Sequence, residues 1–183
     1  MNSLNLAESK NKEAIFAGGC FWCLQADFSQ LSGILEAVSG YDGGHTPNPS
    51  YEQVCSGSTQ YAECVKVVYD SEIISYSQLL DFFWKHIDPT VKDAQFCDYG
   101  TQYRTAIFHL NEEQKNMALA SLEKIKLQFP QIYTQVVPST HFYPAESYHQ
   151  DYYLKNPIRY KYYRWSCGRE SRLKELWKDH SKS

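Results

Sequence analysis

Long apolar runs are absent from this chain of 183 residues. No stretch approaches the roughly 18 consecutive apolar residues that a membrane-spanning helix needs, so we predict a protein without membrane association. The first 12 residues are polar and lack the apolar core of a secretory signal, which favours a cytoplasmic location.

Paired metal-binding motifs are also scarce. Cys20 and Cys23 form the single C-x-x-C of the chain, and His141 and His149 are too far apart to supply the complementary pair. A structural zinc site needs a second pair of ligands, so we predict no bound metal.

The composition is otherwise that of a globular domain, with 43% apolar and 21% charged residues. The length corresponds to one domain, which we place at residues 13–183 after a polar segment, 1–12. Six cysteines in a reducing cytoplasm are more often buried, catalytic or redox-active than joined in structural disulfides.

Positive charge is concentrated at the C-terminal end. Residues 155–183 carry nine Lys or Arg and three acidic residues, whereas the whole chain has a net charge of -3. Basic segments with interleaved aromatics can bind single-stranded nucleic acid. We favour a solvated, partly packed tail instead, irregular in structure, and predict no nucleic-acid partner.

The hydrophobic pattern predicts an α+β fold, a two-layer sandwich in which helices pack on a mixed sheet. We expect strands at 13–17, 34–40, 62–69, 104–110 and 133–137, and helices at 21–31, 76–86, 112–127 and 145–154. The segments 41–58 and 90–101 are long loops, the first with one helical turn at 50–54. Loops of this length inside a compact domain tend to be functional.

The sequence GGCFWC at 18–23 places a cysteine where a strand ends and a helix begins. The N–H groups and positive dipole of a helix start favour a thiolate, so Cys20 is a candidate nucleophile. Phe21 and Trp22 beside it could line an apolar pocket. Cys20 and Cys23 could alternatively form a thioredoxin-like redox pair.

Glu63 lies on the same strand face as Val65 and Val67. A carboxyl at the end of an apolar face is desolvated, and desolvation raises its pKa toward that of a proton donor. Spacing alone leaves open, and slightly favours, a Glu63 exposed at the strand edge. Tyr51 and Tyr103 supply hydroxyls from the two loops, although a chain with 15 tyrosines makes each a weak signal.

Five blocks in order resemble the peptide methionine sulfoxide reductase A family. They are GGCFWC at 18–23, SGYDGGHTPNPSYEQVCSG at 39–57, AECVKVVYD at 62–70, DYGTQYRTAIF at 98–108 and FYPAESYHQDYYLKNP at 142–157. The resemblance implies a ferredoxin-like core in a single catalytic domain. It also implies reduction of the S epimer of methionine sulfoxide, free or in proteins.

The resemblance also assigns roles to residues of this chain. It implies that Cys20 is the nucleophile, Glu63 the acid, and Tyr51 and Tyr103 the hydroxyls that hold the sulfoxide oxygen. The loop aspartate of the family corresponds to Asp98, and its methyl-binding aromatics correspond to Phe21 and Trp22. Cys20 would become a sulfenic acid, form a disulfide with a second cysteine, and be restored by thioredoxin. We expect no bound cofactor, and a monomer.

The chain departs from the family pattern at Cys23, where Gly is frequent, at Gln25, where Glu is frequent, and in its tail. These departures affect recycling. We favour Cys167, in a tail with Gly168 beside it, as the resolving cysteine over Cys23, and Cys23 first with Cys167 second is a third possibility. Cys64 points to the opposite strand face from Glu63. Cys55 and Cys97 lie in loops whose distance from Cys20 the sequence does not define, and they could instead be bystanders near the pocket.

Two other functions compete with this interpretation. A general thiol–disulfide oxidoreductase would use Cys20 and Cys23 and would reduce disulfides without any sulfoxide. A single-strand nucleic-acid binding module would use the basic tail. Neither explains Glu63 or the two tyrosine loops.

Overall fold

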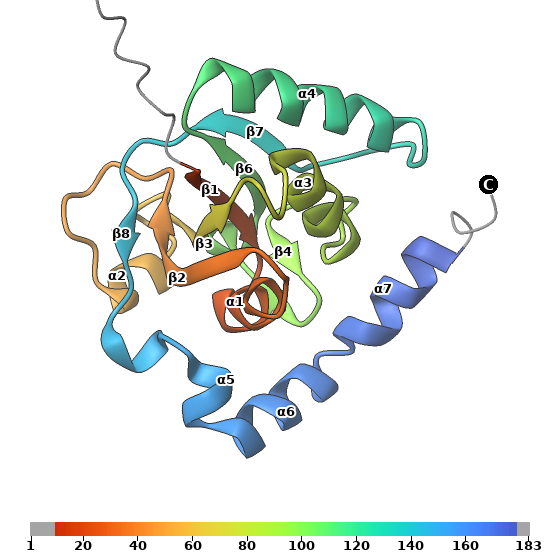
Figure 1. The fold of residues 1–183 in the computed structure, drawn as a ribbon. Coiled ribbons are helices and arrows are strands. Elements are labelled where there is room, and N and C mark those ends of the chain that lie inside the picture. Colours follow the sequence, from red (N-terminus) through yellow and green to blue (C-terminus); the bar gives the residue numbers. More distant parts are fainter. Residues whose placement is uncertain (1–9, 179–183) are drawn as a thin grey trace, which may run out of the picture.

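The protein is described by a computed structural model that covers residues 10–178 (Figure 1). Six strands form one sheet in the order β7-β6-β1-β3-β2-β8, and all neighbours are antiparallel except the parallel pair β6 and β7. The strands are β1 (Asn11–Gly18), β2 (Ile34–Asp42), β3 (Ala62–Asp70), β6 (Thr105–His109), β7 (Gln135–Pro138) and β8 (Tyr143–Pro144). β1 begins within the predicted polar segment, whose residues 1–9 lie outside the described part.

The ferredoxin-like prediction is confirmed. The first four strands of the sheet in chain order lie as β6-β1-β3-β2, and they are connected as β-α-β-β-α-β through α1 (Phe21–Ser29) and α3 (Tyr76–Lys85). A further helix, α4 (Glu112–Lys126), leads from β6 to the parallel strand β7, as parallel pairing requires.

Polar side chains begin three of the helices. Ser50 and Ser75 each complete a capping box, with Gln53 and Gln78, at the starts of α2 (Tyr51–Cys55) and α3. Asn111 accepts the N–H of Gln114 at the start of α4. The helical turn predicted at 50–54 is therefore present as α2, one residue along.

The helices cover one face of the sheet and enclose the main core. Phe16 of β1 stacks between Phe28 of α1 and Phe83 of α3, each with ring centroids 5.1 Å away. Its strand neighbours Ile15 and Ala17 belong to a smaller cluster on the other face. The same alternation along β3 places Glu63 and the buried Cys64 on opposite faces of the sheet, as the sequence predicts.

The predicted irregular tail is wrong. After η2 (Ser147–His149), the chain forms α5 (Tyr152–Lys155), α6 (Pro157–Ser166) and α7 (Arg169–Trp177), which follow one another along one side of the molecule (Figure 1). The single helix predicted at 145–154 is also wrong, because Asp151 takes a left-handed conformation, with φ of 52°. Pro157 starts α6, and Gly168, with φ of 68°, separates α6 from α7.

Ion pairs join the basic tail to the rest of the domain. Arg164 lies 2.8 Å and Arg169 3.8 Å from the carboxylate of Asp27 on α1, and Arg172 lies 2.7 Å from that of Asp88. Asp27 and Arg169 are both buried. The positive charge of the tail is thus partly used in packing against the domain.

The segment 90–101, predicted as a loop, contains a short hairpin of β4 (Ala94–Gln95) and β5 (Asp98–Tyr99). Cys97 in its turn forms a disulfide with Cys167 at the end of α6. Sequence spacing does not indicate this link across 70 residues, and the alternative that Cys97 is a bystander is wrong. Across residues 10–178, no helix is both long and apolar enough to cross a membrane.

We predict that Asp27→Asn destabilises the protein by about 3–5 kcal/mol, because it leaves two arginines beside a neutral, largely buried group. Urea unfolding measures the loss. Asp81→Asn, at an exposed position on α3, is the control and should change the free energy of unfolding by less than about 0.5 kcal/mol. Equal effects of the two substitutions would contradict a docking role for Asp27.

Candidate active site

A small cavity of about 180 Å³ lies where the start of α1 meets β3. Its lining brings together every residue that the sequence analysis assigned to the reduction step or to substrate binding. The lining consists of Cys20, Phe21, Trp22, Tyr51, Glu63, Asp98, Tyr103 and Tyr163. The two proposed resolving residues, Cys23 and Cys167, lie outside it, and Tyr163 is an addition that the sequence analysis missed.

Cys20 occupies the N-cap position of α1, directly after Gly19. Gly19 has φ of 81°, and a Cβ there would lie 2.5 Å from the side chain of Gln95. Only glycine therefore allows the chain to turn from β1 into α1 at this point. The turn places the Cys20 sulfur in the cavity, with the residue only 7% exposed.

The prediction of a lowered Cys20 pKa is wrong for this arrangement. Burial raises the pKa of Cys20 well above its ordinary value, with further contributions from Cys23 and Glu63. Two of the N–H groups expected to favour a thiolate have other partners, since Phe21 N donates to Glu63 and Cys23 N donates to the Cys20 carbonyl. A hydrogen bond from Tyr163 acts in the opposite direction and lowers the Cys20 pKa.

Cys23 is buried one helical turn from Cys20. The hydrogen bond between the two side chains lowers the pKa of Cys23, and the positive charges of Arg169 and Arg164 lower it further. Two arginines of the tail thus stabilise the ionised form of Cys23, the second cysteine of the C-x-x-C motif.

Glu63 is 2% exposed, so the alternative of a solvent-exposed strand-edge glutamate is wrong. Its Oε2 accepts the N–H of Phe21 at 3.1 Å, which joins β3 to the first turn of α1. Burial raises the pKa of Glu63 to about 8, and the nearby charge of Asp98 contributes in the same direction. A carboxyl with this pKa is largely protonated at neutral pH and can donate a proton into the cavity.

Two tyrosine hydroxyls reach the cavity from separate segments, Tyr51 from α2 and Tyr103 from η1 (Thr101–Tyr103). Burial raises the pKa of both hydroxyls, so both are protonated hydrogen-bond donors near neutral pH. Tyr51 N donates to Glu146 Oε1 at 2.9 Å, which fixes the start of α2.

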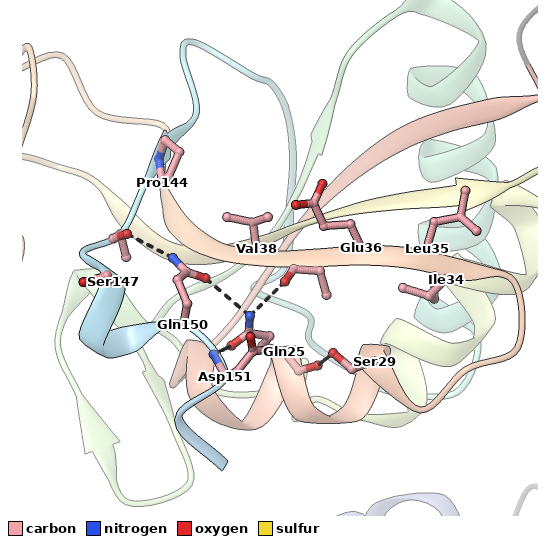
Figure 2. A pocket seen from close by; sticks show the side chains of 12 residues that line it. Gln25, Ser29, Ile34, Leu35, Glu36, Val38, Pro144, Ser147, Gln150 and Asp151 are labelled. Atoms are coloured by element: carbon pink, nitrogen blue, oxygen red, sulfur yellow. Dashed lines mark hydrogen bonds between the residues drawn. The ribbon is translucent and has the colours of Figure 1, made fainter. Parts of the chain in front are cut away.

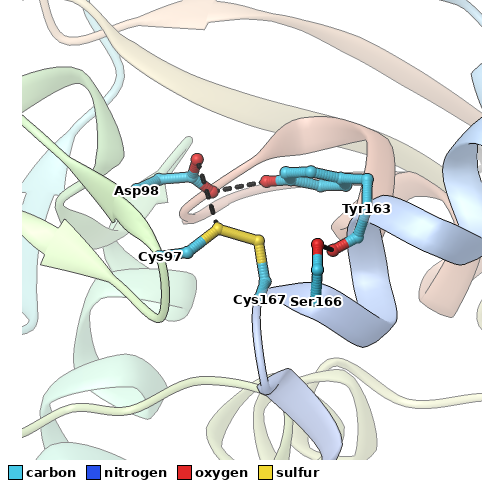
Figure 3. Close-up of a disulfide and its surroundings, with 5 residues drawn as sticks. All are labelled: Cys97, Asp98, Tyr163, Ser166 and Cys167. Atoms are coloured by element: carbon cyan, nitrogen blue, oxygen red, sulfur yellow. Dashed lines mark hydrogen bonds between the residues drawn. A yellow bond between two sulfur atoms is a disulfide. The ribbon is translucent and has the colours of Figure 1, made fainter.

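Asp98 accepts a hydrogen bond from the hydroxyl of Tyr163 at 2.5 Å (Figure 3). The disulfide lies beside this bond in the same view. Cys97 precedes Asp98 in the chain, and Cys167 directly follows α6, the helix that carries Tyr163. Within residues 10–178, the cluster Cys97, Asp98 and Cys167 is the one group of possible ligand atoms close enough for a metal ion. Two of its three members are bonded to each other.

Aromatic rings form the apolar wall of the site. Phe21 packs against Tyr41 and His149, with ring centroids 5.8 Å and 5.0 Å away. Trp22 stacks on Tyr152 at 3.8 Å, and its indole N–H donates to His149 Nδ1 at 3.0 Å. The stacking and the hydrogen bond hold the indole at the edge of the cavity.

A polar network behind this wall involves Gln25, where the family pattern often has Glu. The Gln25 amide donates to the Ala37 carbonyl at 2.8 Å, and its oxygen accepts the N–H of Asp151 at 2.9 Å. Gln25 also bonds to Gln150 (Figure 2), and Gln150 bonds in turn to both backbone groups of Ser39. Because an amide can donate as well as accept, Gln25 ties α1, β2 and the segment after His149 together beside a surface groove.

Sequence reasoning missed His149 and Glu146 as well as Tyr163. His149 and Glu146 lie within the segment 142–157, one of the blocks that carried the family resemblance, so that block was the available signal. Tyr163 lies in the tail, whose helices the sequence did not reveal, and no local pattern distinguishes it from the other tyrosines.

The Glu63 pKa predicts how stability depends on pH. The carboxyl titrates near 4.5 when exposed and near 8 when buried, so its protonated form favours the folded state. That contribution is complete below about pH 4.5 and is lost as pH rises to about 8. We predict that the wild-type protein loses up to about 5 kcal/mol more than Glu63→Gln across this interval.

Urea unfolding at successive pH values provides the measurement. Glu36→Gln, at an exposed position on β2, is the matched control and should follow the wild type. Parallel stability curves for wild type and Glu63→Gln would show that Glu63 does not titrate in this range.

Comparison with known proteins agrees with this geometry. The peptide methionine sulfoxide reductase family matches residues 12–181. The chain is 46% identical over 171 residues to peptide methionine sulfoxide reductase MsrA of Bacillus licheniformis, covering 92% of this chain and 94% of that protein. It is 51% identical over 145 residues to the MsrA of Nautilia profundicola, covering 79% and 84% of the two chains.

Solved structures give the same result. Mxr1 of Saccharomyces cerevisiae in reduced form superposes with a TM-score of 0.78 at 33% identity, over 82% of this chain and 88% of that one. The same yeast protein in complex with Trx2 superposes with a TM-score of 0.57 at 21% identity, over 82% and 91% of the chains, which supports the fold alone. The order of the strands, the lining of the cavity and these similarities agree, and the chain belongs to the peptide methionine sulfoxide reductase family.

Proposed function

We propose that this protein reduces the S epimer of methionine sulfoxide, free or in oxidised proteins, to methionine. The observation that carries the proposal is the cavity itself. It places a cysteine sulfur, a carboxyl with a pKa of about 8 and two protonated tyrosine hydroxyls around one small volume. Those are the groups that a sulfoxide needs for reduction by a thiol.

The sulfoxide oxygen is a strong acceptor, and its sulfur becomes electrophilic when the oxygen is protonated. Glu63 supplies the proton while Tyr51 and Tyr103 hydrogen-bond to the oxygen. The methyl group of the substrate lies against the aromatic wall of Phe21 and Trp22. Asp98 orients the Tyr163 side chain in the same cavity through their hydrogen bond.

The ionised sulfur of Cys20 attacks the sulfoxide sulfur. Two electrons pass to the substrate, which leaves as methionine, and the oxygen leaves with Cys20 as a sulfenic acid. Glu63 supplies the proton on that oxygen, and the proton that Cys20 releases on ionising returns the Glu63 carboxylate to its acid form, so the step balances. A second cysteine then condenses with the sulfenic acid, releasing water and forming a disulfide.

Cys23 and Cys167 are the two proposed partners for the oxidised Cys20. Cys23 lies one helical turn from Cys20, and the two thiols shift each other's pKa, whereas Cys167 is bonded to Cys97 in this structure. These contacts favour Cys23 as the first partner, followed by exchange with Cys167 once that residue is a thiol. An external dithiol such as thioredoxin would then restore the enzyme by disulfide exchange.

We further propose that residues 13–183 act as one catalytic domain, as a monomer in the cytoplasm, with no bound cofactor. Continuity of the sheet from β1 to β8 and the docking of the tail onto α1 support the single domain.

A single turnover with reduced protein tests the function. One equivalent of protein should convert the S epimer to methionine and leave the R epimer unchanged. We predict that Cys20→Ser produces no methionine, because a hydroxyl is neither ionised nor nucleophilic enough to attack sulfur. Mass spectrometry of methionine formation provides the measurement, and turnover close to wild type in Cys20→Ser would refute the mechanism.

Glu63→Gln is the matched comparison, since it keeps Cys20 and removes the proton donor. It should slow the same step about 10²–10⁴-fold. The contact between Cys20 and Cys23 also suits a general thiol–disulfide oxidoreductase. Unimpaired reduction of insulin disulfides by Glu63→Gln, with no sulfoxide reduction by the wild type, would favour that second function.

The order of disulfide formation is a separate prediction. When fully reduced protein receives one equivalent of S-sulfoxide, the Cys20–Cys23 link should form first and the Cys20–Cys167 link later. Digestion without reduction at successive times identifies the linked peptides. Cys167→Ser should retain the first link and lose the second, and Cys55→Ser should change neither. A Cys20–Cys167 link that forms with no earlier Cys20–Cys23 link would contradict this order.

A further inference from the structure

Tyr163 is the residue that the tail contributes to the cavity. It lies on α6, far along the chain from the other lining residues, yet it lines the same cavity as Cys20, Glu63 and Asp98. The assignments carried by the family resemblance do not include it. Its place in the site depends entirely on how the tail packs.

Contacts on several sides hold the Tyr163 side chain. Its hydroxyl donates to Asp98 Oδ2 at 2.5 Å, and its ring lies edge-on to Trp22, with centroids 5.9 Å apart. The next residue, Arg164, pairs with Asp27 of α1. One turn later, Cys167 is bonded to Cys97, the neighbour of Asp98 (Figure 3).

Tyr163 and Cys20 line the same cavity. The Tyr163 hydroxyl favours the ionised form of Cys20, which lowers the Cys20 pKa and opposes the effect of burial. Burial and the charges of Cys20 and Asp98 raise the pKa of Tyr163, so its hydroxyl keeps its proton across the working pH range. One hydroxyl proton serves one acceptor at a time, so Asp98 and an ionised Cys20 compete for it.

Hydrogen bonds to an ionised group are stronger than those between neutral groups. Asp98 is the acceptor in the arrangement described, where Cys20 has a raised pKa. When Cys20 ionises to attack the substrate, its sulfur becomes a second charged acceptor within reach of the same hydroxyl.

We propose that Tyr163 is a catalytic residue, which donates its hydroxyl hydrogen bond to the ionised sulfur of Cys20 and is held by Asp98 between turnovers. The proposal rests on the proposed sulfoxide reduction for its role in turnover. The effect of the Tyr163 hydroxyl on an ionised Cys20 does not depend on the sulfoxide and can be tested in the free protein.

Other titratable groups around Cys20 also influence how its ionisation depends on pH. From the elements that pack against the cavity these are Cys23, Glu63, Tyr51, Tyr103, Asp98 and Tyr163. A test must therefore change Tyr163 and leave the remaining groups in place.

Tyr163→Phe removes only the hydroxyl, and Tyr162→Phe is the control on the same helix, since Tyr162 is 69% exposed. Iodoacetamide alkylation of Cys20, located by tandem mass spectrometry, is measured from pH 6 to 10 with the Cys97–Cys167 disulfide intact. A lost hydrogen bond to a charged sulfur should slow alkylation of Cys20 about 10- to 100-fold in Tyr163→Phe. Single-turnover methionine formation from the S-sulfoxide should slow by a similar factor.

Equal alkylation rates in Tyr163→Phe and Tyr162→Phe would overturn the proposal, and so would slower alkylation with an unchanged single-turnover rate. If the wild type formed no methionine, the proposed function would fail while the alkylation result still decided the hydrogen bond.

If Tyr163→Phe does not fold, Asp98→Asn carries the test. A weaker acceptor at position 98 releases the hydroxyl toward Cys20, so alkylation of Cys20 should become faster. A slower rate in Asp98→Asn would overturn the proposal.

Discussion

The hydrogen bond from Phe21 N to Glu63 is the contact on which the site depends. It joins the first turn of α1 to β3 and gives a buried carboxyl its one strong partner. Burial without any partner would be costly, and full solvation would return the pKa to its ordinary value. The single bond therefore keeps Glu63 inside the protein while leaving its pKa high enough for proton donation.

Two features of the same helix start have opposite effects on the pKa of Cys20. A nucleophile benefits from a helix N-terminus, but here the N–H of Phe21 donates to Glu63 and that of Cys23 donates to the Cys20 carbonyl. Burial then dominates and keeps the thiol protonated. The proposed reaction needs an ionised sulfur, so the groups that stabilise that charge have to come from outside the first turn of α1.

The tail supplies such groups. Arg164 and Arg169 lower the pKa of Cys23, and Tyr163 donates to Asp98 and lowers the pKa of Cys20. The ion pairs to Asp27 and the disulfide to Cys97 hold these residues against the domain. A segment that has the composition of a solvated basic extension is thus part of the site.

The sequence by itself determined the α+β class, the main strands and helices, and the residues Cys20, Glu63, Tyr51, Tyr103 and Asp98 as candidates for one site. Periodicity, helix caps and the Gly-Gly-Cys turn are local signals, and the family resemblance supplied the rest. Only the tertiary structure decided that Glu63 is buried, that Cys20 has a raised pKa, and that Cys97 pairs with Cys167. It also decided that Tyr163 enters the cavity. Each of these properties depends on desolvation or on contacts between segments far apart in the chain, which no local pattern encodes.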